Sequence, residues 1–244
     1  MKNSIFTTIL AFCFGVQAIN ASVQTDIEKA NQSGKAVFLV VTEPGNPDEA
    51  KALALTKDAQ VLYSKSSIVQ MNRADKANDD LVKKYQLSGV PLPVILVIAS
   101  NGVLGGGMLF SNATSQNIVA LIPSPKKAEV LSAMQDGKSV FLVISKKSMN
   151  KKEILSKCEI ACSEMKENAK IVEVDFDDAA EKKFLGELKI TEIGDTPQTY
   201  VINSQGQIAG FFIGVTDSQK LAATAAKKPV GKCCSSGSSK SCGK

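Results

Sequence analysis

Histidine is absent from all 244 residues of the chain. Its absence excludes every catalytic arrangement that needs an imidazole base and every metal site with imidazole ligands. Tryptophan is absent too, and aromatic residues make up only 5% of the chain. Because nucleic-acid-binding proteins often stack bases on aromatic side chains, this composition argues against nucleic-acid partners. The 29 basic and 24 acidic residues are scattered, which is typical of a solvated surface.

Apolar runs long enough to cross a membrane are also missing. The run at residues 5–16 has about a dozen residues, whereas a membrane-spanning helix needs about 20. It follows Lys2 and precedes the small residues Ala18 and Ala21, which is the order of a secretory signal peptide. We therefore expect a signal peptide over residues 1–21, cleaved after Ala18 or Ala21. The mature protein is then secreted or periplasmic and has no membrane span.

Cysteine is sparse and unevenly distributed. Loss of Cys13 with the signal peptide would leave five cysteines, all in the second half of the chain: Cys158, Cys162, Cys233, Cys234 and Cys242. Export would place them in a compartment where disulfides form. An odd number leaves at least one thiol free, bound to metal, or joined to another molecule in an intermolecular disulfide.

The chain contains an internal repeat with an offset of 103 residues. The sequence GKAVFLVVT at 34–42 aligns with GKSVFLVIS at 137–145. One extra residue later in the second copy brings Pro93 opposite Pro197. Two copies of about 100 residues fit two ordinary domains and not a solenoid of short units. We expect domains over 22–122 and 123–228, with a tail at 229–244.

Both copies predict the same order of elements: strand, helix, strand, helix, two strands joined by a turn, and a closing helix. In the first copy the expected strands are 36–41, 68–72, 94–99 and 103–110, and the expected helices 27–32, 79–85 and 115–121. In the second copy the expected strands are 140–145, 171–175, 200–203 and 207–213, and the expected helices 151–167, 179–188 and 218–226. This order predicts an α/β fold with a mixed sheet and helices on both faces.

Prolines mark two further boundaries. Asn46, with Glu49 three residues later, predicts a capped helix that starts with Pro47 in its first position. Residues 122–125 contain two prolines and predict the linker between the domains.

This order of elements, with a proline just before the third strand, resembles the thioredoxin fold. The stretches that carry the resemblance are YQLSGVPLPVILVI at 85–98 and IGDTPQTYVI at 193–202. The resemblance implies two tandem thioredoxin-like domains, with candidate cis peptide bonds at Leu92-Pro93 and Thr196-Pro197. It also implies grooves beside Pro93, Pro197 and Thr196 as surfaces for a partner protein or an extended peptide.

The chain departs from the thioredoxin pattern at the active site. Active thioredoxins carry Cys-x-x-Cys where the first strand leads into its helix, but the corresponding residues here are GNPD at 45–48 and SMNK at 148–151. Without a thiol, neither position supports thiol–disulfide exchange. We therefore expect a redox-inactive binding module and not an enzyme. The alternative is an oxidoreductase that uses Cys158, Cys162 and the tail cysteines.

Cys158 and Cys162 lie four residues apart on one expected helix, so their side chains share one face. They are core-filling residues, a strained disulfide, or a thiolate pair for a soft metal such as Cu(I) or Zn(II). The tail is rich in Ser, Gly and Lys, which predicts a flexible segment. Its three cysteines, Cys233, Cys234 and Cys242, are candidates for a Cu(I) or Zn(II) site, for capture of thiols, or for disulfides within the chain or to another protein.

Overall fold

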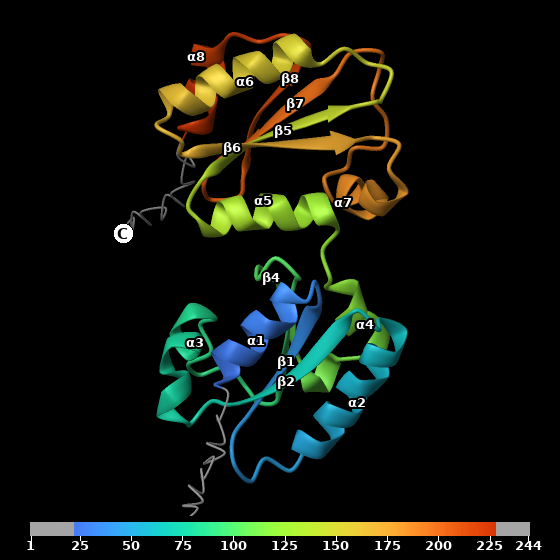
Figure 1. The fold of residues 1–244 in the computed structure, drawn as a ribbon, viewed down its shortest axis with the longest axis vertical. Coiled ribbons are helices and arrows are strands. Elements are labelled where there is room, and N and C mark those ends of the chain that lie inside the picture. Colours follow the sequence, from blue (N-terminus) through green and yellow to red (C-terminus); the bar gives the residue numbers. More distant parts are fainter. Residues whose placement is uncertain (1–21, 228–244) are drawn as a thin grey trace, which may run out of the picture.

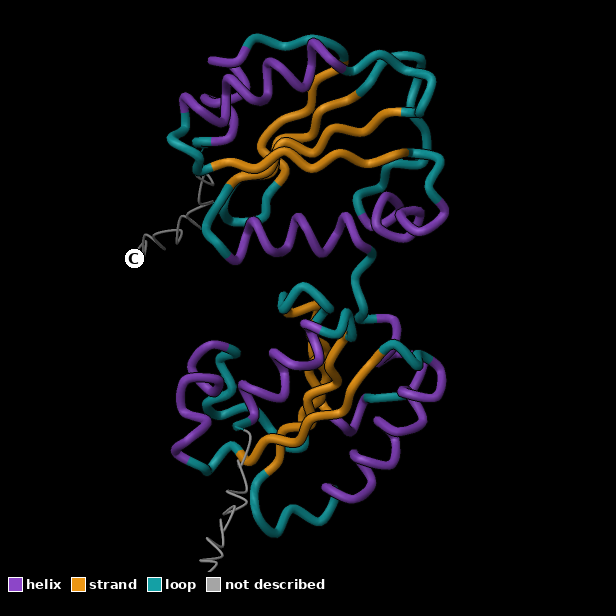
Figure 2. The backbone as a smooth tube through the Cα atoms, viewed as in Figure 1, coloured by secondary structure: helices purple, strands orange, loops and turns teal. Residues whose placement is uncertain are grey.

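A computed structural model describes residues 22–227, so the expected signal peptide and the tail with Cys233, Cys234 and Cys242 lie outside the described residues. The described part folds into two α/β domains, one above the other in Figure 1. Each contains a four-stranded sheet with helices on both faces, as the tube view in Figure 2 also shows.

The two domains repeat one series of elements. The first domain contains α1 (Val23–Gln32), β1 (Ala36–Thr42), α2 (Glu49–Leu62), β2 (Ser66–Asn72), α3 (Asp79–Lys84), β3 (Val94–Ile98), β4 (Leu104–Leu109) and α4 (Ser115–Ala120). The second contains α5 (Pro125–Gln135), β5 (Ser139–Ser145), α6 (Lys152–Glu164), β6 (Ala169–Asp175), α7 (Lys182–Glu187), β7 (Gln198–Ile202), β8 (Ile208–Ile213) and α8 (Ser218–Ala225). Short 3₁₀ helices also occur, at η1 (Lys76–Asn78), η2 (Phe110–Asn112) and η3 (Ala179–Glu181).

Both sheets are mixed, as the sequence predicts. The strand orders are β2-β1-β3-β4 and β6-β5-β7-β8. β1 pairs with β2, and β5 with β6, in parallel, whereas all other pairs are antiparallel. The expected fold class is therefore confirmed: the chain forms two tandem thioredoxin-like domains.

The central strands β1 and β5 carry the core of each domain. All seven residues of each strand are buried, because each strand has a neighbour on both sides and helices on both faces. On β1, Leu39 packs toward α1 and α3, and Phe38 packs toward α2 and α4. On β5, Leu142 packs toward α5 and α7, and Phe141 packs toward α6 and α8. The continuous apolar runs of the repeat thus become the two sheet centres.

The start of α2 differs from the expectation. Pro47 is expected in the first position of the helix, but α2 begins at Glu49. The Asn46 side chain accepts a hydrogen bond from the Asp48 N–H at 3.0 Å, so it closes a turn before the helix and caps no helical N–H group. Pro47 lies inside that turn.

The linker between the domains is shorter than expected. Residues 122–125 are expected to form it, but Pro125 is already the first residue of α5. The Ser124 hydroxyl caps this helix, because its oxygen accepts a hydrogen bond from the Lys127 N–H at 3.3 Å. Proline has no N–H to lose at the first helical position, so Pro125 fits there.

One of the two expected cis peptide bonds is present. Leu92-Pro93 is cis, but Thr196-Pro197 is not, and that expectation is wrong. The loop between α7 and β7 has one residue more than the loop between α3 and β3. Trans is the favoured form of an X-Pro bond, and Thr196-Pro197 keeps it.

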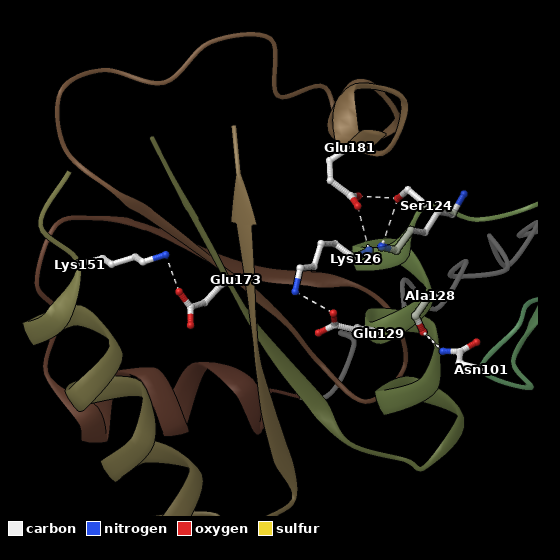
Figure 3. Close-up of polar contacts among 9 residues, drawn as sticks. Asn101, Ser124, Lys126, Ala128, Glu129, Lys151, Glu173 and Glu181 are labelled. Carbon is white, nitrogen blue, oxygen red and sulfur yellow. Dashed lines mark hydrogen bonds and ion pairs between the residues drawn. The ribbon is translucent and has the colours of Figure 1, made fainter. Parts of the chain in front are cut away.

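Helix α5 also joins the two domains. It lies on the side of its own sheet that faces the first domain, above β4 in Figure 1. Ala128 packs against Ala99 and Val103 of the first domain. The Asn101 side-chain amide donates a hydrogen bond to the Ala128 carbonyl oxygen at 3.0 Å, which Figure 3 shows. Helix α5 is absent from the helices that the sequence predicts, and it forms part of the contact between the domains.

Candidate functional site

In the first domain, an ion pair lies next to residues 45–48, which stand where active thioredoxins carry Cys-x-x-Cys. Arg73 follows β2 and places its guanidinium 2.6 Å from the carboxylate of Glu43, at the end of β1. The same guanidinium donates hydrogen bonds to the carbonyl oxygens of Leu87 at 3.1 Å and Val90 at 2.6 Å. Arg73 thus ties the end of β1 to the loop that leads to Pro93. Sequence reasoning missed this residue, although it is the only arginine in the chain.

Pro93 itself is buried in the first domain. Its carbonyl oxygen accepts a hydrogen bond from the Phe110 N–H at 2.9 Å, which fixes the start of β3 against the end of β4. A partner at this site would therefore contact the neighbours of Pro93 and not the proline ring.

In the second domain, a lysine lies where the second thiol is expected. Lys151 is the N-cap residue of α6, and its ammonium lies 2.5 Å from the carboxylate of Glu173 on β6 (Figure 3). Met149 packs against the apolar core beneath α5 and α7. These side chains serve packing and ion pairing, and neither is a nucleophile that can replace a thiol.

The loop before β7 presents an exposed residue beside the edge of the second sheet. Thr196 is exposed and Pro197 is buried. The Pro197 carbonyl oxygen accepts a hydrogen bond from the Gly214 N–H at 2.9 Å. The Thr196–Pro197 segment therefore lies directly beside the end of β8, which is an edge strand.

Large apolar side chains are exposed along this edge. Phe211, Ile213 and Val215 are 44%, 63% and 49% exposed. Phe211 and Ile213 alternate along β8, so they share one face, and Val215 follows the end of the strand. The Phe211 ring contacts the ring of Tyr200 on β7, with centroids 4.7 Å apart. We call Thr196, Phe211, Ile213 and Val215 the β8 surface.

The first domain has no counterpart of the β8 surface. The aligned residues are Gly107, Leu109 and Ser111: one has no side chain, one is half-buried and one is polar. Sequence reasoning places a strand at 207–213 and a groove at Thr196 and Pro197, but it does not show that the intervening apolar face is left uncovered.

Cys158 and Cys162 lie inside the second domain. Their exposed fractions are 0% and 8%, no disulfide joins them to each other, the other cysteines being outside residues 22–227, and they pack with Phe141, Ala161 and Leu221. Burial raises the pKa of the Cys158 thiol to about 12, with smaller contributions from the nearby Cys162 and Glu159. Burial likewise raises the pKa of the Cys162 thiol to about 11. Thiols that hold their proton so firmly are poor nucleophiles and poor metal ligands near neutral pH.

Two further properties limit the chemistry of the described part. Within residues 22–227, no group of three or more Cys, Asp or Glu side chains is placed to hold a metal ion. No helix in that range is long and apolar enough to cross a membrane.

No protein-family model and no curated protein matches the chain. Among solved structures, it is similar to the first two thioredoxin domains of Saccharomyces cerevisiae Eps1p, with 12% identity, a TM-score of 0.32, and coverage of 84% of this chain and 96% of that one. It is similar to the zinc-bound form of human ERp44, with 9% identity, a TM-score of 0.34, and coverage of 82% and 56%. It is also similar to the NTD_N/C domain of alkylhydroperoxide reductase AhpF from Enterococcus faecalis, with 11% identity, a TM-score of 0.25, and coverage of 84% and 98%.

Proposed function

We propose that this tandem thioredoxin-like protein is exported, is redox-inactive, and binds an extended apolar segment of a partner protein at the β8 surface. The observation that carries the proposal is the row of exposed apolar side chains beside Thr196, in a domain with no thiol at the start of α6. A row of this kind is costly to leave in water and is typical of an interaction site.

The position of this row on an edge strand supports an extended partner. The outer side of β8 carries backbone N–H and C=O groups that do not pair within the sheet. A partner segment that adds as a further strand would satisfy these groups, and its alternate side chains would contact Phe211 and Ile213. The strand itself, IAGFFI, contains no charged residue and no proline that would prevent such pairing.

Ile213→Lys is expected to weaken binding of an unfolded chain by about 10-fold or more, because a buried isoleucine contributes about 1.5–3 kcal/mol. The probe is reduced, carboxymethylated α-lactalbumin, which is held unfolded and offers many apolar segments. Fluorescence anisotropy of the labelled probe measures its affinity for the full chain. Since Ile213 is 63% exposed, the variant should keep its fold.

Val61→Lys is the matched control, because Val61 is an 83% exposed apolar residue on α2, outside the β8 surface. It should leave the affinity unchanged. Equal affinities of wild type and Ile213→Lys, or equal losses in both variants, would exclude the β8 surface as the binding site.

The tail cysteines are the second part of the proposal. Cys158 and Cys162 are buried with raised pKa values, so we assign soft-metal or thiol capture to Cys233, Cys234 and Cys242. Three thiolates are a ligand set that suits Cu(I) or Zn(II). The same pKa values argue against the alternative of an oxidoreductase that uses Cys158 and Cys162.

Alkylation of the full chain with iodoacetamide at pH 8, mapped by mass spectrometry, tests both points. Burial raises the pKa of Cys158 to about 12 and that of Cys162 to about 11, so both thiols stay protonated at this pH. Both should stay unmodified until the chain is denatured. The tail cysteines should react at once and be protected by stoichiometric Cu(I) under anaerobic conditions.

Rapid labelling of Cys158 and Cys162 in the folded chain would contradict the proposal that these two thiols are unreactive. Equal labelling of the tail with and without Cu(I) would remove the metal site. The intact mass of protein recovered from the expressing cells tests export, because cleavage removes residues 1–18 or 1–21 and retention of Met1 would contradict it.

A further inference from the structure

A cavity of about 360 Å³ lies between the two domains, away from the β8 surface. Its walls come from the end of α3, the start of β4 and the last turns of α5, and consist of Lys84, Tyr85, Val103, Leu104, Leu131, Met134 and Gln135. The volume is at the lower end of the range of small-molecule sites, about 300–1,000 Å³. The cavity therefore has room for one small ligand that contacts both domains.

The walls of this interdomain cavity are held by contacts outside it. Val103 is 4% exposed and packs with Ala99 and Ala128 in the small core between the domains. Met134 lies against the turn at Gly206, where an added Cβ atom would come 2.5 Å from the Met134 Cε atom. A side chain larger than glycine at this turn would displace Met134, so the sequence of the turn helps to shape the cavity.

The polar groups of the cavity favour a negatively charged ligand. Lys84 supplies an ammonium group at the wall, 5.3 Å from the centre of the Tyr85 ring, and no acidic residue lines the cavity. The Tyr85 hydroxyl is buried and closed off from the cavity, so this tyrosine contributes its ring to the wall. The Lys84 ammonium is the only charged group of the cavity wall, so the cavity favours a ligand with a negative charge.

We propose that the interdomain cavity binds a small amphiphile with an aliphatic body and one carboxylate, such as a medium-chain fatty acid. The aliphatic body contacts Leu104, Leu131 and Met134. The carboxylate pairs with the Lys84 ammonium, which lies 5.3 Å from the centre of the Tyr85 ring at the cavity wall. Such charge-assisted hydrogen bonds are stronger than neutral ones.

Calorimetric titration of the full chain with decanoate, kept below its micelle concentration, tests the site. We expect saturable binding of one decanoate per chain. Decyltrimethylammonium has the same chain with the opposite charge, and acetate has the carboxylate without the chain, so neither should show saturable binding. Absence of decanoate binding, or equal binding of decyltrimethylammonium, would overturn the proposal.

Two variants locate the binding. Leu131→Trp fills the cavity and should weaken decanoate binding at least 10-fold. Lys84→Gln should weaken it about 5- to 10-fold, whereas Lys83→Gln, the exposed neighbour outside the cavity wall, should leave it unchanged. Because Lys84 is exposed, Lys84→Gln tests the site even where the tryptophan variant fails to fold. An unchanged affinity in Lys84→Gln would place the ligand elsewhere and overturn the assignment.

Discussion

Replacement of Phe141 by alanine is expected to lower the free energy of unfolding of the second domain by about 3–5 kcal/mol. Phe141 is fully buried in the middle of β5 and contacts the cluster beneath α6 and α8 that contains Cys158 and Val201. The change removes a large apolar surface and leaves a cavity that this packed centre cannot close. Urea denaturation followed by circular dichroism measures the loss.

Phe38→Ala is the matched variant in the first domain, because Phe38 occupies the same register position of β1 and is also fully buried. Hydrogen exchange measured on peptides assigns each loss to a domain. Phe141→Ala should speed exchange in β5 and Phe38→Ala in β1. A loss of less than about 1 kcal/mol for Phe141→Ala would mean that the site is far less packed than its burial indicates.

Replacement of Glu181 by alanine is expected to lower the free energy of unfolding by about 2–4 kcal/mol. Glu181 is 1% exposed, and its carboxylate accepts hydrogen bonds from the Ser124 hydroxyl at 2.5 Å and the Lys126 N–H at 3.0 Å (Figure 3). Without it, the first turn of α5 loses two partners at a buried site. Urea denaturation again measures the change.

Glu187→Ala provides the comparison for Glu181→Ala. Glu187 also reaches α5, through an ion pair with Lys127 at 2.5 Å, but its side chain is 39% exposed. An ion pair with this much solvent contact contributes about 0–1 kcal/mol. Similar losses in the two variants would show that burial does not decide the importance of Glu181.

The strands could be predicted because their sequence signal is local. The apolar runs of β1 and β5 are buried on both faces of their sheets, and the repeat places one run on the other. The local sequence does not show whether a proline starts a helix or lies in a turn before it. Pro47 and Pro125 each follow a residue that caps helices well, yet the Asn46 side chain bonds to Asp48 within a turn, whereas the Ser124 side chain bonds to Lys127 within a helix. The choice between these bonds depends on how the next element packs.

The polar contacts and the cavity could not be predicted, because their parts are far apart in the sequence. Glu181 and Ser124 are 57 residues apart, and Arg73 reaches Glu43 across 30 residues. The repeat gives no help here, since Asn78 aligns with Glu181 and donates instead to the Asn72 carbonyl oxygen. The interdomain cavity needs walls from both domains, so it follows only from their contact through α5.

Because β8 has no charged residue, the strand is open to pairing with unwanted chains when no partner covers it. Many edge strands carry a lysine, a proline or a bulge that repels other strands, and such residues protect a protein from aggregation. The register shift of β8 lies near its beginning, opposite Val201 and Ile202, and leaves the segment from Gly210 to Ile213 regular and apolar. We expect a strand that discriminates so little between partners to add also to misfolded chains or to further copies of itself. The concentration at which this protein stays dispersed therefore depends on what covers β8.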